Sequence, residues 1–276
     1  MPEVSLESLS LIFAMLTTGV IGGLLAGLLG IGGGIVIVPV LFVALGILGI
    51  DPSIRMHIAV ATSLATIIPT SVSSAWSHHR HGAVDTDLAG RWSLAILVGA
   101  IVGVYIASLV ESQVLTAVFA SVALLVAVKM LLPLEDFTLA NSVPRGLGSN
   151  VVPFGIGAVS TMMGLGGGVL GVPVLTLCRH PIHLAVGTAA LFGLIISVPA
   201  TVGYVWAGWG HPALPAASLG YVNLIGVLLI APLTVLAAPF GARIAHRISR
   251  RRLSLLFGLF LLLASVRLFY SLLAES

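Results

Sequence analysis

Long runs of apolar residues, separated by short polar stretches, dominate this sequence. The runs 9–29, 58–77, 92–110 and 220–242 carry no charged residue, and the run 253–273 carries only Arg267. A helix that crosses the hydrocarbon core of a bilayer needs about 20 mainly apolar residues. Because each run is close to that length, the pattern predicts a series of membrane-spanning helices.

The chain divides into ten apolar segments, five in each half. They are expected at about 9–29, 35–49, 57–77, 91–110 and 114–133, and then at 151–163, 169–178, 183–207, 218–245 and 252–273. At 1.5 Å per residue, the segment 35–49 extends about 22 Å and the segment 169–178 about 15 Å, whereas the hydrocarbon core is about 30 Å thick. We therefore expect these two to be broken or re-entrant helices that begin at a glycine loop inside the membrane.

The composition excludes a soluble domain. Of the 276 residues, 58% are hydrophobic and 8% are charged, and the mean hydropathy is +1.18, whereas a soluble domain carries about 25% charged residues. The expected fold class is therefore an all-α polytopic membrane protein. The single cysteine, Cys178, excludes an intrachain disulfide framework. The net charge of +3 does not indicate nucleic-acid binding, because the basic residues lie in short loops between the spans.

Two short motifs recur at matching places in the two halves. Gly30-Ile-Gly-Gly-Gly-Ile-Val-Ile-Val-Pro-Val-Leu41 aligns without a gap with Gly164-Leu-Gly-Gly-Gly-Val-Leu-Gly-Val-Pro-Val-Leu175, and eight of the twelve positions are identical. Further along, His57-Ile-Ala-Val-Ala-Thr62 aligns with His183-Leu-Ala-Val-Gly-Thr188. Self-similarity of this kind marks an internal repeat. We expect a first repeat at 1–133, a cytoplasmic linker at 134–150 and a second repeat at 151–276.

The basic residues predict how the chain is oriented in the membrane. The short loop before the last segment contains Arg247, Arg250, Arg251 and Arg252, and short loops rich in Lys and Arg stay in the cytoplasm. Counting spans back from this loop puts both termini on the periplasmic or extracellular side of a multi-pass protein in the bacterial inner (plasma) membrane. Each half crosses an odd number of times, so the second repeat is expected to be inverted, as in many secondary transporters.

The two glycine loops are the first candidates for a binding site. They comprise Gly32, Gly33 and Gly34 in the first half and Gly166, Gly167 and Gly168 in the second. Each loop precedes a short helix whose first amides have no partner within the helix, and those amides together with the helix dipole favour an anion. Two such points that enter from opposite faces form one site near the midplane. The alternative is that the glycines only allow close helix packing.

The doubled motif resembles a known family. Two Gly-Gly-Gly-hydrophobic-Pro motifs, each followed by an Ala-Val-Gly-Thr-like segment, are similar to those of the TauE/SafE sulfite exporter family of membrane transporters. The resemblance covers nearly the whole chain in the right order. It implies a transporter that exports a small anion such as sulfite or an organosulfonate. The chain departs from the family pattern at Ala61, where Gly is expected, and at Ala189, where Ser is expected, which affects the identity of the substrate.

Hydroxyl side chains near the glycine loops are further candidates. Their O–H groups would donate hydrogen bonds to sulfite or sulfonate oxygens, although Ser and Thr commonly bond back to their own helix instead. The expected substrate-binding set adds Thr62, Ser63, Ser160, Thr161 and Thr188, together with the two prolines of the glycine motif, Pro39 and Pro173.

No Asp or Glu lies in the middle of a predicted span, where proton-driven transporters often carry one. His57 and His183 match between the halves and are candidates for proton coupling, because His changes charge near neutral pH. Anchoring at the membrane surface is the alternative role of these histidines, and sodium coupling is the alternative mechanism.

No metal site, cofactor or nucleic-acid partner is expected. The stripe Gly19, Gly23 and Gly27 predicts helix packing, either within the chain or in a homodimer.

Together these features predict a secondary transporter that exports a small anion by alternating access around the paired glycine loops. The preferred candidates for the anion are sulfite and small organosulfonates. The alternatives are an anion channel and an uptake permease for another small organic anion. An intramembrane enzyme is not expected, because Cys178 has no evident partner in the sequence and the spans hold no pair of carboxylates.

Overall fold

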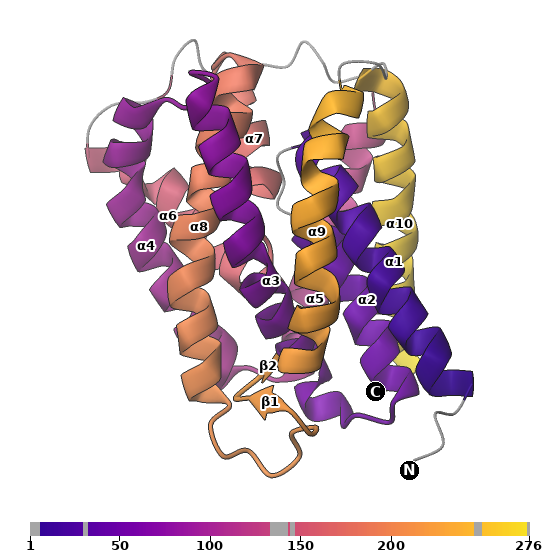
Figure 1. The fold of residues 1–276 in the computed structure, drawn as a ribbon. Coiled ribbons are helices and arrows are strands. Elements are labelled where there is room, and N and C mark those ends of the chain that lie inside the picture. Colours follow the sequence, from indigo (N-terminus) through magenta and orange to yellow (C-terminus); the bar gives the residue numbers. More distant parts are fainter. Residues whose placement is uncertain (1–5, 30–32, 133–142, 144–146, 246–249, 275–276) are drawn as a thin grey trace.

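The computed structural model describes residues 6–29, 33–132, 143, 147–245 and 250–274, so most of the expected linker lies outside the described residues. The helices are α1 (Leu6–Leu29), α2 (Gly34–Ile47), α3 (Pro52–Arg80), α4 (Thr86–Leu109), α5 (Ser112–Leu131), η1 (Leu147–Asn150, a 3-10 turn), α6 (Val151–Met163), α7 (Gly168–Leu177), α8 (Ile182–Ala207), α9 (Leu224–Ala245) and α10 (Arg250–Ala274). Two short strands, β1 (Ser218–Leu219) and β2 (Val222–Asn223), precede α9. Figure 1 shows the helices in one bundle, and we call the end that carries β1 and β2 the hairpin end.

Six helices of the described chain, namely α3, α4, α5, α8, α9 and α10, are long and apolar enough to cross a bilayer. They confirm the predicted all-α polytopic membrane fold. In contrast, α2 has 14 residues and α7 has 10, which correspond to about 21 Å and about 15 Å of helix. Both are therefore too short to span the hydrocarbon core, as the sequence predicts, and they lie toward opposite ends of the bundle in Figure 1.

The helix contacts come in matching pairs when α1–α5 are exchanged for α6–α10. The contact of α1 with α9 matches that of α6 with α4. The contact of α3 with α9 matches that of α8 with α4, and the contact of α2 with α3 matches that of α7 with α8. Helices α3 and α8 pack against each other, as do α5 and α10. Two copies of one five-helix unit that pack around a two-fold axis would produce this pattern.

Glycines bring the backbones of α1 and α9 into contact. A Cβ atom at Gly19 would lie 2.9 Å from a backbone oxygen of α9, and one at Gly23 would lie 2.5 Å from the carbonyl oxygen of Thr234. In the second half, a Cβ atom at Gly157 on α6 would meet the backbone of α4 in the same way. Gly19 and Gly23 of the predicted stripe therefore pack within the chain, which is one of the two roles expected for it.

The start of α9 differs from the expectation. The pattern predicts a helix over 218–245, but the helix begins at Leu224, and the preceding residues form β1 and β2. Gly220 has φ +54°, which allows a tight turn between the two strands. Asn223 then accepts a hydrogen bond at Oδ1 from the amide of Gly226, at 2.8 Å, and so caps the new helix. The apolar run hides this boundary because the hairpin itself contains few polar residues.

Candidate functional site

The two glycine loops meet inside the bundle. Gly34, the first residue of α2, lies so close to the second loop that a Cβ atom there would be 2.5 Å from the carbonyl oxygen of Gly164. Ser63 on α3 donates a hydrogen bond of 2.8 Å from its Oγ to the same carbonyl, and all three residues are buried. The structure thus brings together Ser63 and the facing ends of both glycine motifs.

Two glycines in these loops have backbone angles that favour glycine. Gly33, just before α2, has φ +75°, and Gly164, just after α6, has φ +69°. A Cβ atom at Gly33 would also lie 2.8 Å from the carbonyl oxygen of Gly22 on α1. Since only glycine adopts such angles at little cost, these residues let each loop turn tightly and a short helix follow. The neighbouring Gly32 lies outside the described residues.

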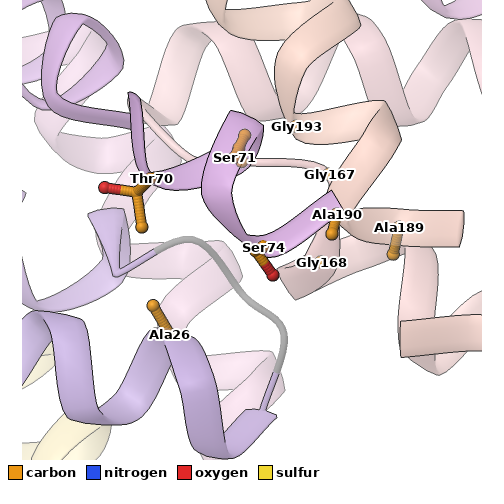
Figure 2. Close-up of a pocket in the computed structure, with 10 residues that line it drawn as sticks. Ala26, Thr70, Ser71, Ser74, Gly167, Gly168, Ala189, Ala190 and Gly193 are labelled. Atoms are coloured by element: carbon orange, nitrogen blue, oxygen red, sulfur yellow. The ribbon is translucent and has the colours of Figure 1, made fainter. Parts of the chain in front are cut away.

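A small cavity lies at the start of α7. Its volume is about 10 Å³, close to the smallest space that holds a water molecule. The second glycine loop and helices α1, α3 and α8 line it, through Ala26, Thr70, Ser71, Ser74, Gly166, Gly167, Gly168, Ala189, Ala190 and Gly193. Figure 2 shows Ser71 near Gly193 and Ser74 near Gly168. The cavity therefore joins the three expected glycines of the second loop with hydroxyls from α3.

Sequence reasoning missed the α3 hydroxyls of this cavity, Thr70, Ser71 and Ser74. A signal was present, because Ser63, Thr66, Thr70 and Ser74 recur at steps of three and four residues and so form a polar stripe on an apolar helix. Within the stripe, Thr66 Oγ1 donates to the carbonyl oxygen of Ser63 at 2.7 Å and Thr70 Oγ1 to that of Thr66 at 2.9 Å. A single Ser or Thr in a span is often satisfied in this way, so only the periodicity distinguishes the stripe.

The cavity offers hydrogen-bond donors, and no carboxylate is found among the described residues that line it. The first amides of α7 have no partner within the helix, and this end of the helix carries the positive end of its dipole. The Ser71 and Ser74 side chains add hydroxyl groups. A helix start of this kind is a ready-made site for a small anion.

Thr62 and Thr188 anchor two helix starts. Thr62 Oγ1 accepts a hydrogen bond of 3.0 Å from the amide of Asn223, and Thr188 Oγ1 accepts one of 2.9 Å from the amide of Asp85. Asn223 caps α9 and Asp85 caps α4, each through its own side-chain oxygen. The two threonines therefore have the same structural role in the two halves, and neither lines the cavity at α7.

His57 and His183 lie in different surroundings. His57 is only 4% exposed, and its Nε2 lies 3.0 Å from the carbonyl oxygen of Ala107, so Nε2 must carry the proton. Its Nδ1 has no hydrogen-bond partner within the described ranges, and its ring lies 5.0 Å from that of Tyr221 between centroids. His183, by contrast, is exposed. Of the two, only His57 presents a buried nitrogen that can accept a proton.

The remaining candidates fall into two groups. Ser160 and Thr161 are fully buried near the end of α6, and their hydroxyls have no hydrogen-bond partner among the residues that the structure describes. Pro39 lies apart from the α7 cavity and lines an apolar cavity of about 400 Å³ between α2 and α10, whose described lining includes the charged residue Arg267. Pro173 is half-buried on α7 and lines neither cavity.

The chain matches one protein family and several membrane proteins along most of its length. A family model described as "Sulfite exporter TauE/SafE" matches residues 15–268. A "Probable membrane transporter protein" of Haemophilus influenzae is 32% identical over 259 residues, which make up 94% of this chain and 98% of that protein. A probable membrane transporter protein of Bacillus subtilis is 23% identical, over 93% of this chain and 96% of that protein. One of Methanocaldococcus jannaschii is 24% identical, over 95% of this chain and 99% of that protein. No solved structure matches the chain significantly.

Proposed function

Since the chain belongs to the sulfite exporter TauE/SafE family of membrane transporters, we propose that it is a secondary transporter that exports a small anion. The preferred candidates for this anion are sulfite and small organosulfonates. The family match confirms the resemblance that the doubled glycine motif indicates. The cavity at the start of α7 supports the substrate class, because helix amides and the hydroxyls of Ser71 and Ser74 surround one small space. The oxygens of a sulfur oxyanion accept hydrogen bonds from such donors.

Transport through this site requires a change of conformation. The cavity of about 10 Å³ is hardly larger than a water molecule needs, so it must widen to admit an anion of several heavy atoms. In our proposal the two halves are inverted and rock against each other around the contact between Gly34 and Gly164, opening the site to one side at a time. The halves meet through α1–α9, α4–α6, α5–α10 and α3–α8, so in this proposal the contacts that change during transport lie among these helix pairs.

We assign proton coupling to His57 within this proposal. Its protonated Nε2 already donates to Ala107, so a further proton would bind at Nδ1 of the ring, which packs against the ring of Tyr221. In proteoliposomes, a pH gradient should drive uptake by the unmodified protein but not by His57→Gln, while His183→Gln should respond normally because His183 is exposed. Equal gradient-driven uptake in both variants would remove His57 from the mechanism, and a dependence on sodium alone would establish the alternative coupling ion.

The substrate class is tested by a thermal-shift screen of the purified protein against sulfite, sulfate, sulfoacetate, taurine and common carboxylates. A ligand that binds only the folded state stabilises it by about 2.7 kcal/mol at a concentration 100 times its Kd. Sulfite or a sulfonate should therefore raise the melting temperature, and the carboxylates should not. A shift with carboxylates alone would contradict the substrate class.

The transport mode is tested by counterflow. Proteoliposomes loaded with the anion identified in the screen should take up labelled anion from outside with saturation, which is the behaviour of a carrier. Electrical currents at single-channel rates would instead establish the anion channel, the alternative to a transporter. Saturable uptake into whole cells without export would establish an uptake permease.

A further inference from the structure

Four buried hydroxyl oxygens on α6 and α8 lack the hydrogen bonds that other hydroxyls in this chain make. They are those of Ser160, Thr161, Ser197 and Thr201, and none has a hydrogen-bond partner among the described residues. The first three residues are fully buried. Hydroxyls in helices commonly donate to a carbonyl one turn back, as Thr66 and Thr70 do. A buried hydroxyl without a partner costs about 1–3 kcal/mol, so four of them in two neighbouring helices call for an explanation.

The α8 hydroxyls lie on the helix face that borders the second glycine loop. Gly193, Ser197 and Thr201 follow one another at steps of four residues, and with Tyr204 they fall within about 80° of one another around the helix. At one end of this row, Gly193 lines the α7 cavity and a Cβ atom there would lie 3.6 Å from the amide of Gly167.

The other end of the row meets α6. The Tyr204 hydroxyl donates to the carbonyl oxygen of Thr161 at 3.4 Å, and Tyr204 is fully buried. Ser197 and Thr201 therefore lie on α8 between a contact with the start of α7 and a contact with the end of α6. Ser160 and Thr161 carry their unpartnered hydroxyls at that same end of α6.

Tyr204 is fixed in place at the hairpin end of this row. Its backbone carbonyl accepts hydrogen bonds from the amide of Gly208 at 3.1 Å and from that of Tyr221 at 3.3 Å. The bond from Tyr221 ties the last turns of α8 to the hairpin formed by β1 and β2. The Tyr204 side chain in turn reaches α6, since its hydroxyl bonds to the carbonyl oxygen of Thr161.

We propose that Ser197 and Thr201 line a path for the anion that continues from the α7 cavity along α8, and that Tyr204 closes this path toward the hairpin end. This inference rests on the proposed transport function and extends it to residues outside the glycine loops. Neutral hydroxyls suit such a path, because they donate to an oxyanion without the strong attraction of a fixed positive charge, which would slow its release. Ser160 and Thr161 contribute from the opposite wall.

Cysteine labelling tests the path. The background is Cys178→Ser, since Cys178 is the only cysteine of the chain. Ser197→Cys and Thr201→Cys place thiols on the proposed path, whereas Val198→Cys and Val202→Cys place them one residue further on, at positions that are 43% and 60% exposed on the outside of the bundle. The probe is a methanethiosulfonate reagent that carries a sulfonate group, applied to protein in nanodiscs so that both faces are accessible.

The path thiols should react at least about tenfold faster than the two controls, because a thiol that faces lipid stays protonated and thiolate is the reactive form. Tyr204→Phe, which keeps the ring but loses the bond to Thr161, should accelerate labelling at Thr201→Cys further. Equal rates at path and control positions, or no labelling at either path position, would overturn the proposal. Labelling needs no substrate, so a failed path and a failed substrate assignment give different results.

Discussion

Gly167 shows most directly what the candidate site demands of a single residue. Its backbone angles, φ −59° and ψ −18°, are ones that any residue adopts. However, a Cβ atom there would meet Phe192 on α8 and lie 2.9 Å from the carbonyl oxygen of Ala189. Close approach of α7 to α8, rather than an unusual conformation, therefore requires glycine at this position. At Gly33 the backbone conformation itself also requires glycine, because φ is +75°.

Gly167→Ala should reduce transport by about tenfold or more while the protein still inserts into the membrane. The added methyl group forces a backbone shift that costs about 1–3 kcal/mol at the start of α7, and about 1.4 kcal/mol corresponds to a factor of ten. Initial rates of anion uptake in proteoliposomes measure the effect. Gly155→Ala on α6 is the matched control, since no atom lies within 4 Å of the added Cβ. Unchanged transport in Gly167→Ala would refute this site assignment.

Thr188→Val should lower the free energy of unfolding by about 1 kcal/mol, because the half-buried amide of Asp85 then loses its acceptor. Thr188→Ser keeps the hydroxyl and should unfold like the unmodified protein. Unfolding in a graded series of denaturing detergent mixtures measures both. If the valine variant were as stable as the unmodified protein but no longer bound the anion, the threonine would be a ligand rather than an anchor.

At the scale of elements, the glycine contacts decide which helices can lie together. Helix α1 approaches α9 through Gly19 and Gly23, and α6 approaches α4 through Gly157. In lipid, helices associate by close packing rather than by burial from water, so small residues at these crossings have a large effect. The short helices α2 and α7 are then positioned by α1 and α6, the helices that directly precede them in the chain.

Gly23→Ile should destabilise the protein by about 1–3 kcal/mol or more, because the side chain would have to fit against the backbone of Thr234. Ile21→Val, at a position 45% exposed on the same helix, is the control and should have little effect. Thermal unfolding and size-exclusion chromatography together separate the two roles of the stripe. A variant that kept its stability but changed its oligomeric state would support a dimer contact instead.

For the whole molecule, the paired helix contacts suggest that two units related by a two-fold axis enclose the glycine loops. Helix α5 begins at the hairpin end and α10 begins at the opposite end in Figure 1, although the two occupy matching places in the two halves. We propose that the axis lies in the plane of the membrane, which makes the halves inverted. The two short helices then enter from opposite faces and meet where Gly34 contacts Gly164.

Reporter tags next to Glu111 and next to Arg250 should lie on opposite sides of the membrane. Glu111 precedes α5 and Arg250 begins α10, and the basic loop before α10 predicts that this side is the cytoplasm. Protease protection or a pair of compartment-specific reporter enzymes measures the outcome. Tags that both report the same side would contradict the inversion and the alternating-access mechanism built on it.

Much of the fold follows from the sequence alone, because the solvent is apolar. Lipid requires each crossing segment to be a helix of nearly fixed length, so counting apolar residues is sufficient to find the six long helices of the described chain and the short helices α2 and α7. The family is recognised in the same way, since two aligned glycine motifs need no structure, and the family model that matches residues 15–268 confirms it. The internal repeat remains a prediction from the same alignment. The start of α9 was missed, because the hairpin before it is as apolar as a helix.

Only the tertiary structure decided which hydroxyls face the candidate site. The sequence marks Thr62 and Thr188 as a matched pair, but they accept hydrogen bonds from helix starts across the bundle. Ser71 and Ser74, which lie outside the repeated motifs, line the cavity instead. Helical periodicity determines which residues share a face, not which helix that face meets. That partner depends on how closely the glycines let the helices approach, which is a property of the packed molecule.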